Sequence, residues 1–246
     1  MPDASHLRAF LERAVVEESV FALRPDYRAV LVAAEGLRPG PSDEADERLL
    51  VRAETAARAA LAGRSVEELP HVAAWRDAYR AFGAKPQRTR NSLEALLRRV
   101  DGGLPRINRL TDISNAISVS HQLPIGGEDL QQYHGPPRLT RAAGMEPFDT
   151  TAGGEPVTEH PDPGEVIWTD DSGVTCRFWN WRQGRRTRLR DTTTTALFIL
   201  DVLDPTTEEA VQDAVADLSN HLERLGPNVR IGSRVISAAA LSGRDG

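Results

Sequence analysis

Hydrophobic positions in the first half of the chain recur at helical spacing. Leu7, Phe10, Leu11 and Val15 follow this spacing, and later segments repeat it behind capping residues and before closing glycines. We therefore predict helices over residues 1–20, 42–62, 70–82, 91–101 and 104–119. Between the first two, an unbroken apolar run over residues 27–34 predicts a buried strand.

The second half has a different pattern. From residue 123 to about residue 175 the chain is rich in Gly, Pro, Thr and Asp, which predicts short strands and turns, with a hairpin over residues 166–179. An apolar run over residues 196–203 predicts another buried strand. Thr206 begins a capping box ahead of an amphipathic helix, and residues 229–231 are a last candidate strand. The pattern predicts an α+β fold of mixed strands and hairpins packed with helices, with a helix-rich N-terminal half.

Charge is distributed unevenly along the sequence. The 246 residues include 36 acidic and 30 basic ones, so the net charge is −6 and a uniformly basic nucleic-acid-binding protein is excluded. Residues 76–109, however, hold nine basic and three acidic residues, and residues 177–190 hold six arginines and no acid. These clusters are either ordinary solvated faces or two surfaces that together hold an RNA backbone, and the sequence leaves both interpretations open.

Several function classes lack their sequence signatures. There is no P-loop, dinucleotide fingerprint, HExxH or Gly-x-Ser-x-Gly motif, and the six histidines have no metal-ligand spacing. The single cysteine, Cys176, lies in an apolar strand, which favours an inert thiol over a nucleophile. No apolar run reaches the roughly 18–20 residues of a membrane span. We expect the protein to be cytoplasmic, with no membrane association, no bound metal ion and no cofactor.

The helix predicted over residues 104–119 is unusually polar. Asn and Ser are poor choices inside a helix because their side chains compete for backbone hydrogen bonds. The polar positions are Asn108, Thr111, Asp112, Ser114, Asn115 and Ser118. Either one edge of this helix faces a pocket, or these residues form a structural hydrogen-bond network.

Several segments together resemble a known domain. They are residues 82–86 (FGAKP), 92–99 (SLEALLRR) and 104–115 (LPRINRLTDISN), supported by residues 123–126 (LPIG), 163–166 (PGEV) and 176–182 (CRFWNWR). In these segments the chain resembles the B3/B4 domain, which is the editing module of the bacterial phenylalanyl-tRNA synthetase beta subunit, and more closely its free-standing relatives. The resemblance runs from about residue 25 to 225. It implies one B3/B4-type domain over residues 1–246, with the helix of residues 1–20 and the tail of residues 235–246 peripheral.

The resemblance implies that the chain hydrolyses the ester between a wrong amino acid and the 3′ end of a tRNA. Nothing in the chain is similar to the catalytic module of the synthetase, so we expect no amino-acid activation. The chain departs from the family pattern at Gly126, where the family has a histidine, and at Asp201, where it has a glutamate. The expected partner is therefore an aminoacylated tRNA, with no DNA, and no particular oligomeric state is predicted.

Residue roles follow from the resemblance combined with the chemistry of an activated ester. To hydrolyse such an ester, an enzyme has to hold it, position a water molecule and stabilise the oxyanion of the intermediate. No strong protein base is required. We expect Asn115 and Asn180 to be catalytic by orienting the water or the carbonyl, and Ser114, Gly126 and Asp201 to bind the substrate. The residues expected to contact tRNA are Lys85, Arg88, Arg90, Arg182, Trp179 and Trp181, with one of the two tryptophans stacked on the terminal adenine.

Two rival functions remain. The first is a non-catalytic module that binds an amino acid or a tRNA, which the missing loop histidine at Gly126 favours. The second is a hydrolase of a small aminoacyl ester, which the two arginine clusters disfavour because a small substrate needs no extended cationic face. Salt dependence discriminates between them, since a tRNA-dependent activity weakens steeply with salt.

Overall fold

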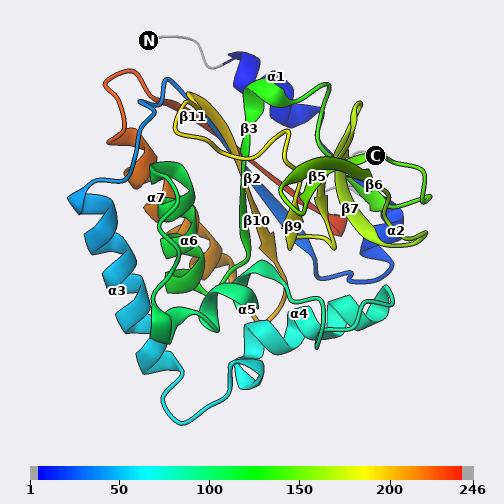
Figure 1. The fold of residues 1–246 in the computed structure, drawn as a ribbon, viewed down its shortest axis with the longest axis horizontal. Helices are drawn as coiled ribbons and strands as arrows, with labels where there is room; N and C mark the ends of the chain where they lie inside the picture. Colours follow the sequence, from blue (N-terminus) through cyan, green and yellow to red (C-terminus); the bar gives the residue numbers. More distant parts are fainter. Residues whose placement is uncertain (1–4, 240–246) are drawn as a thin grey trace.

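The computed structural model describes residues 5–239 and is built around a four-stranded antiparallel sheet (Figure 1). Its strand order is β11 (Arg230–Ser237), β2 (Arg28–Glu35), β10 (Thr195–Val202) and β3 (Ile125–Asp129). The two predicted apolar runs therefore form the neighbouring strands β2 and β10, which pair along all eight residues. A strand buried on both faces needs no polar alternation, and this explains why both runs are continuously apolar.

The two faces of this sheet carry two separate hydrophobic cores. Val30 and Val32 of β2 face one core, whereas Leu31 and Ala33 face the other, as the two-residue period of a strand requires. The first core is closed by α3 (Glu44–Ala60), α5 (Ser92–Leu97), α6 (Arg109–His121) and α7 (Glu208–Glu223). Figure 1 shows α3, α6 and α7 side by side on this face.

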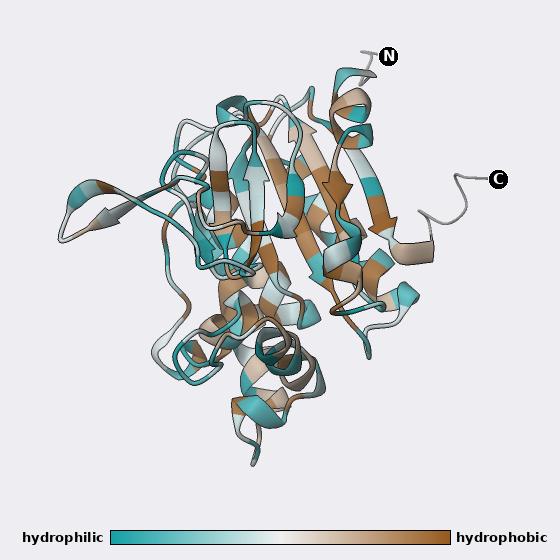
Figure 2. Cartoon of the chain, turned by 90° about the vertical axis from the view of Figure 1, so that its right-hand side faces the viewer, coloured by the Kyte–Doolittle hydropathy of each residue, from teal (hydrophilic) through white to brown (hydrophobic). Residues whose placement is uncertain are grey.

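The second core lies between the central sheet and a second, seven-stranded sheet. That sheet has the order β1 (Val15–Val16), β4 (Arg138–Arg141), β7 (Val166–Asp170), β8 (Gly173–Arg177), β5 (Phe148–Ala152) and β6 (Glu155–Glu159), with β9 (Arg182–Gln183) paired to β8. The helices α1 (Ser5–Glu12), α2 (Glu18–Phe21) and α4 (Pro70–Ala81) also contribute to this core. Single-turn 3₁₀ helices cover Val66–Glu68, Val100–Gly102 and Leu130–Gln132. Figure 2 shows hydrophobic residues concentrated along the strands, with hydrophilic residues prominent in the loops.

The predicted α+β class and the helix-rich N-terminal half are confirmed. The helix predicted over residues 104–119 is wrong at its start, because α6 begins at Arg109. Asn108 has extended backbone and its side chain accepts the backbone N–H of Thr111 at 3.0 Å, so it caps the helix. Ile107 consequently lies outside the helix and is 61% exposed instead of buried.

Further boundaries differ from the sequence prediction. The helix predicted over residues 1–20 is wrong in its described part, because α1 ends at Glu12 and the short strand β1 and the helix α2 follow it. The cap of α7 is Thr207, one residue later than expected, and its hydroxyl accepts the backbone N–H of Ala210 at 3.2 Å. The strand expected over residues 229–231 continues to Ser237 because every residue of β11 pairs with β2. Leu7 of α1 and Ile236 of β11 are buried, so both ends of the described chain contribute to the second core. Within residues 5–239 no helix is long and apolar enough to cross a bilayer.

Candidate functional site

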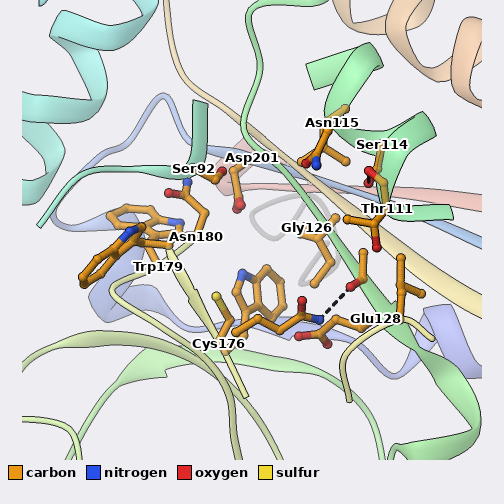
Figure 3. A pocket seen from close by; sticks show the side chains of 17 residues that line it. Ser92, Thr111, Ser114, Asn115, Gly126, Glu128, Cys176, Trp179, Asn180 and Asp201 are labelled. Atoms are coloured by element: carbon orange, nitrogen blue, oxygen red, sulfur yellow. Dashed lines mark hydrogen bonds between the residues drawn. The ribbon is translucent and has the colours of Figure 1, made fainter. Parts of the chain in front are cut away.

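A pocket of about 170 Å³ opens where α5 and α6 meet the β3 edge of the central sheet and the hairpin segment of the second sheet (Figure 3). Its lining joins residues far apart in the chain: Ser92, Thr111, Ser114, Asn115, Ile125, Gly126, Gly127, Glu128, Trp168, Cys176, Trp179, Asn180, Trp181, Gln183, Leu189, Ile199 and Asp201. All five residues that we expected to be catalytic or substrate-binding are among them. Their grouping in one pocket is what the site hypothesis requires.

The polar residues of α6 divide between the pocket and the scaffold. Thr111, Ser114 and Asn115 are three and four residues apart and line the pocket, as one face of a helix allows. Asp112 instead accepts the backbone N–H of Ile107 at 2.8 Å, which holds the chain before the helix. Both interpretations of this polar run therefore apply, each to different residues. Ser114 is itself engaged, because its hydroxyl donates to the carbonyl of Thr111 at 3.0 Å.

Two adjacent glycines of β3 differ in what surrounds them. A Cβ on Gly126 would have no heavy atom within 4 Å and would stand on the pocket side of the strand. A Cβ on Gly127 would come within 2.5 Å of Leu189 and 3.1 Å of Phe198 in the first core. Gly126 therefore leaves space in the pocket, whereas Gly127 permits close packing behind it.

Asn180 reaches the pocket from a strained bend between β8 and β9. Phe178 and Trp179 both have left-handed backbone, with φ of 51° and 66°, which is costly for bulky residues. The Tyr79 hydroxyl lies 2.5 Å from the carbonyl of Phe178 and 3.0 Å from Oδ1 of Asn180, so it holds both groups. Asn180 is only 7% exposed, and its Nδ2 has no hydrogen-bond partner. The Nδ2 amide group thus faces the pocket beside the Asp201 carboxyl without a hydrogen bond that fixes it.

Asp201 lies at the inner end of the pocket, near Asn180 (Figure 3). Its carboxylate is buried and accepts the hydroxyl proton of Tyr27 at 2.5 Å. Burial raises the pKa of Asp201 to about 7, and Tyr27, Asn180 and Trp168 act in the opposite direction. This carboxyl therefore exchanges its proton near neutral pH.

Glu128 is a pocket residue that the sequence analysis missed. Its side chain is buried and accepts the hydroxyl proton of Tyr133. Burial is the main cause that raises the pKa of Glu128 to about 8; the nearby Asp170 and Asp201 act in the same direction, and Thr175 and Arg186 act against it. The sequence signal for Glu128 is its spacing from Gly126: the two residues are two positions apart on the same strand, so they lie on the same face of the sheet.

Two other lining residues complete the inner wall. Trp168 is buried, and its indole N–H has no hydrogen-bond partner. Cys176 lies beside it, and burial raises the pKa of its thiol well above the ordinary value. A thiol that stays protonated is a poor nucleophile, in agreement with the inert role expected for it.

The residues expected to contact tRNA are not all available. Trp179 has no exposed surface and packs against Tyr27, Trp75 and Phe82, so the expectation that it could stack on a terminal base is wrong. Trp181, in contrast, is 38% exposed and lines the pocket.

Arg182 and Lys85 also stand apart from the pocket. Both terminal nitrogens of Arg182 donate to Glu159, at 2.6 and 2.8 Å, so this arginine is already matched by an acid. Lys85 is exposed and lines a separate hollow together with Arg88 and Phe178. Neither residue lines the pocket itself.

A cationic hollow adjoins the pocket and shares Trp181 with it. We call this feature the arginine hollow; its lining residues are Arg88, Arg90, Ala95, Arg98, Arg99 and Trp181. Arg88 and Arg99 are exposed and form no ion pair within the described chain. The hollow is therefore a cationic surface at the pocket mouth that includes two unmatched guanidinium groups.

Most arginines of the two sequence clusters are matched by acids from elsewhere in the chain. Arg106 pairs with Glu54 at 2.5 Å, and Arg177 pairs with Glu165 at 2.7 Å. Among residues 5–239, the cluster members without an ion pair are Lys85, Arg88, Arg99, Arg188 and Arg190. The two clusters are therefore not two uniformly cationic faces, because folding neutralises most of their excess charge. In the same range, no three His, Cys, Asp or Glu side chains converge as a metal ion would need.

A comparison with protein families identifies the family of this chain. The family model described as the B3/4 domain matches residues 74–226. A solved structure of an N-terminal fragment of the phenylalanyl-tRNA synthetase beta subunit from Pyrococcus horikoshii is similar at 14% sequence identity, with a TM-score of 0.45. That similarity covers 89% of this chain and 49% of the fragment, so this chain spans about half of it. No curated protein matches. Because the family model matches more than half of the residues of this chain, the chain belongs to the B3/4 domain family.

Proposed function

We propose that this chain is a single B3/B4-type domain that acts in trans as an aminoacyl-tRNA deacylase, hydrolysing the ester between a wrong amino acid and the 3′ end of its tRNA. The observation that carries the proposal is the shared wall at Trp181. On one side of it lies a pocket large enough for an aminoacyl group, and on the other lies the arginine hollow. An acylated tRNA end has this same division, with an amino acid joined to a nucleotide chain of phosphates.

The pocket supplies what an activated ester needs. The unpartnered Nδ2 of Asn180 is the donor for the ester carbonyl and for the oxyanion that replaces it. The carboxylate of Asp201, on the same side of the pocket, pairs with the α-ammonium group of the aminoacyl ester. Asn115, on the α6 wall, orients the attacking water.

The reaction follows from these positions. Water attacks the ester carbonyl carbon and yields a tetrahedral intermediate whose oxyanion accepts the Asn180 N–H. The intermediate collapses with cleavage of the bond to the ribose oxygen, which takes up the proton that the water loses. The products are the free amino acid and a tRNA with an intact terminal ribose. The neighbouring ribose hydroxyl assists the water, so the absence of a histidine in the pocket lining does not prevent the reaction.

The arginine hollow and Trp181 hold the tRNA end. The exposed guanidinium groups of Arg88 and Arg99 meet phosphates, and the exposed ring of Trp181 stacks on the terminal base. Arg90 is within the same hollow, and Lys85 lies beside Arg88 in the next one.

A deacylation panel tests the proposal. The protein is incubated with tRNAs carrying matched and mismatched amino acids, with amino acid and tRNA varied separately, and release of the amino acid is measured. For a hydrolysed substrate, Asn180→Ala lowers kcat by roughly 10²- to 10³-fold because it removes an oxyanion donor. Asn220→Ala, in an exposed asparagine of α7, is the matched control and leaves the rate unchanged. If no member of the panel is hydrolysed faster than in buffer, the proposal fails.

One feature favours a second candidate, a non-catalytic sensor. Gly126 offers no side chain at a position that faces the pocket, and the pocket lining holds no histidine. A sensor would bind an aminoacylated or uncharged tRNA without turnover. Tight, saturable tRNA binding together with unchanged ester lifetimes in the panel would select this alternative.

A further inference from the structure

Buried carboxyl groups in this chain are usually matched by an arginine. Ten Asp and Glu side chains are buried within residues 5–239, and six of them form an ion pair. The six pairs are Glu35–Arg230, Asp46–Arg109, Glu54–Arg106, Glu94–Arg76, Glu165–Arg177 and Asp170–Arg186. An unmatched buried carboxyl is therefore an exception that requires an explanation.

Two of the four exceptions are explained by the backbone. Asp112 accepts the N–H of Ile107, and Asp129 accepts the N–H of Gln131 at 3.0 Å. The other two, Glu128 and Asp201, line the pocket, and each accepts the hydroxyl proton of a tyrosine. The two buried carboxyl groups that lack both a cation and a backbone N–H donor are thus the two that line the pocket.

Strand register places these carboxyl groups at opposite ends of one surface. Gly126 pairs with Ile199, and Glu128 pairs with Leu197, so Glu128, Gly126, Ile199 and Asp201 share the pocket side of the sheet. Asp201 lies four residues beyond Leu197, which corresponds to about 13 Å along the strand. Gly126 lies between the two ends, where a Cβ would meet open space. Figure 3 shows the two carboxyl groups on different sides of the pocket.

A second observation supports one orientation of the ester in the pocket. Asn180 is buried, and its unpartnered Nδ2 stands at the Asp201 end of the pocket. Under the proposed function, the ester carbonyl and the α-ammonium group therefore lie at Asp201. The amino-acid side chain then extends past Gly126 toward Glu128.

We propose that Glu128 is the specificity-determining residue of this pocket and selects aminoacyl groups whose side chain ends in a positively charged amino group. The α-ammonium group pairs with Asp201, and the side-chain ammonium group pairs with Glu128, so that both unmatched carboxyl groups gain a cation. This inference rests on the proposed function. It agrees with the elevated pKa of Glu128, which a bound cation would lower.

The test compares substrates of equal shape on one tRNA. The side chains are those of lysine, of 2-aminoheptanoic acid, which replaces the ammonium group by methyl, and of 6-hydroxynorleucine, which replaces it by hydroxyl. We expect the wild-type kcat/KM to favour lysyl-tRNA over the methyl analogue by roughly 10- to 100-fold, the range of a charged hydrogen bond. Glu128→Gln should reduce this ratio to near unity, and Glu209→Gln, an exposed control on α7, should preserve it.

The outcomes separate this inference from the proposed function. A wild-type ratio near one, a ratio that survives Glu128→Gln, or equal preference for the hydroxyl analogue overturns the role of Glu128 while hydrolysis stands. If no ester is hydrolysed, L-lysinamide serves as a probe that cannot be turned over as an ester. Its binding should raise the Tm of the wild type and should raise that of Glu128→Gln less. An equal shift in both proteins, or none in either, overturns the inference.

Discussion

The Nδ2 of Asn180 forms no hydrogen bond, whereas the other polar groups of this residue are engaged. Tyr79 holds its Oδ1 at 3.0 Å, and its backbone N–H donates to the carbonyl of Phe178 at 2.7 Å. The left-handed backbone of Phe178 and Trp179 costs roughly 1–3 kcal/mol per residue. It persists because the N–H of Trp179 donates to Val166 O at 2.6 Å and that of Phe178 to a carboxylate oxygen of Glu165. The donor is thus fixed before a substrate arrives.

At the same scale, the raised pKa of Glu128 predicts how the free energy of unfolding depends on pH. Burial raises its pKa to about 8, whereas an exposed glutamate in the unfolded chain titrates near 4.3. Between these values the folded state binds the proton more tightly, so the free energy of unfolding falls as pH rises. Glu128→Gln removes this ionisation, and we expect it to be more stable than the wild type by roughly 1–3 kcal/mol at pH 9 and less so at pH 5.

Urea denaturation at pH 5, 7 and 9 measures this difference. The pKa of Asp201 is also raised, to about 7. Because Asp201 titrates in both proteins, its contribution to the pH dependence of stability cancels to first order in the comparison. Asp170 and Arg186, the charged neighbours of Glu128, are likewise unchanged. A stability difference that grows toward acidic pH would contradict the predicted direction.

Single residues could be predicted from the sequence where local pattern or family resemblance places them. Asn115, Gly126 and Asp201 were expected to act together, and all three line one pocket. Trp179 could not be predicted, because its burial depends on aromatic neighbours up to about 150 residues away in the chain, among them Tyr27. Their approach is a property of the tertiary fold.

At the scale of elements, the two sides of β3 have different surroundings: one side packs against the first core, and the other borders the pocket. Its first-core side, at Gly127, must admit Leu189 and Phe198, whereas its pocket side, at Gly126, must remain open. Within residues 5–239 β3 pairs with β10 alone among the strands, and its other edge is met by an isolated bridge from Glu128 to Arg188 and by the side chain of Gln183, which donates to the carbonyl of Gly127 at 2.6 Å. A short edge strand therefore positions both the packing and the pocket.

The two glycines make a matched pair of variants. Gly127→Ala places a methyl group against packed side chains and should lower the free energy of unfolding by roughly 1–3 kcal/mol. Gly126→Ala meets no atom and should change stability by less than about 1 kcal/mol, yet it narrows the pocket and should raise KM for a hydrolysed ester. Thermal unfolding and steady-state deacylation measure the two effects. Equal loss of stability in both variants would show that the assignment of the two sides is wrong.

Elements were predictable where caps and hydrophobic periodicity coincide. The start of α3 was expected near residue 42, and the structure has a full capping box at Asp43. Residues 104–108 misled the prediction because Ile107 continues the helical spacing by chance. The competing factor is Asn108, whose side chain ends the extended segment by capping Thr111. Periodicity alone does not register such a side-chain cap.

At the scale of the whole molecule, charge is organised by tertiary pairing. Segments that are strongly basic in sequence meet acidic side chains from distant segments, as in the pairs of Arg106 with Glu54 and of Arg186 with Asp170. Local charge sums therefore overestimate the cationic surface. What remains beside the pocket is the smaller arginine hollow, with Arg88 and Arg99 unmatched.

Salt dependence follows from this smaller surface. We expect deacylation under kcat/KM conditions to weaken about tenfold or more between 50 and 200 mM salt. The double variant Arg88→Gln and Arg99→Gln should lower the slope of log(kcat/KM) against log[salt] by about 1 to 2 units. Arg8→Gln, in an exposed arginine that lines neither hollow, is the control and should leave the slope unchanged. A wild-type rate that hardly responds to salt would favour a small-ester hydrolase instead.

The position of β10 limits how the chain can change in length. Its residues alternate between the helix-covered core and the pocket, with Leu200 and Val202 on one side and Ile199 and Asp201 on the other. Inserting or deleting one amino acid inside this strand would exchange the two sets. Asp201 would then face the helix-covered hydrophobic core, and Val202 would face the pocket. We therefore expect changes in length to be tolerated in the connecting loops and not in β10, and a deletion scan across β10 should yield no folded product.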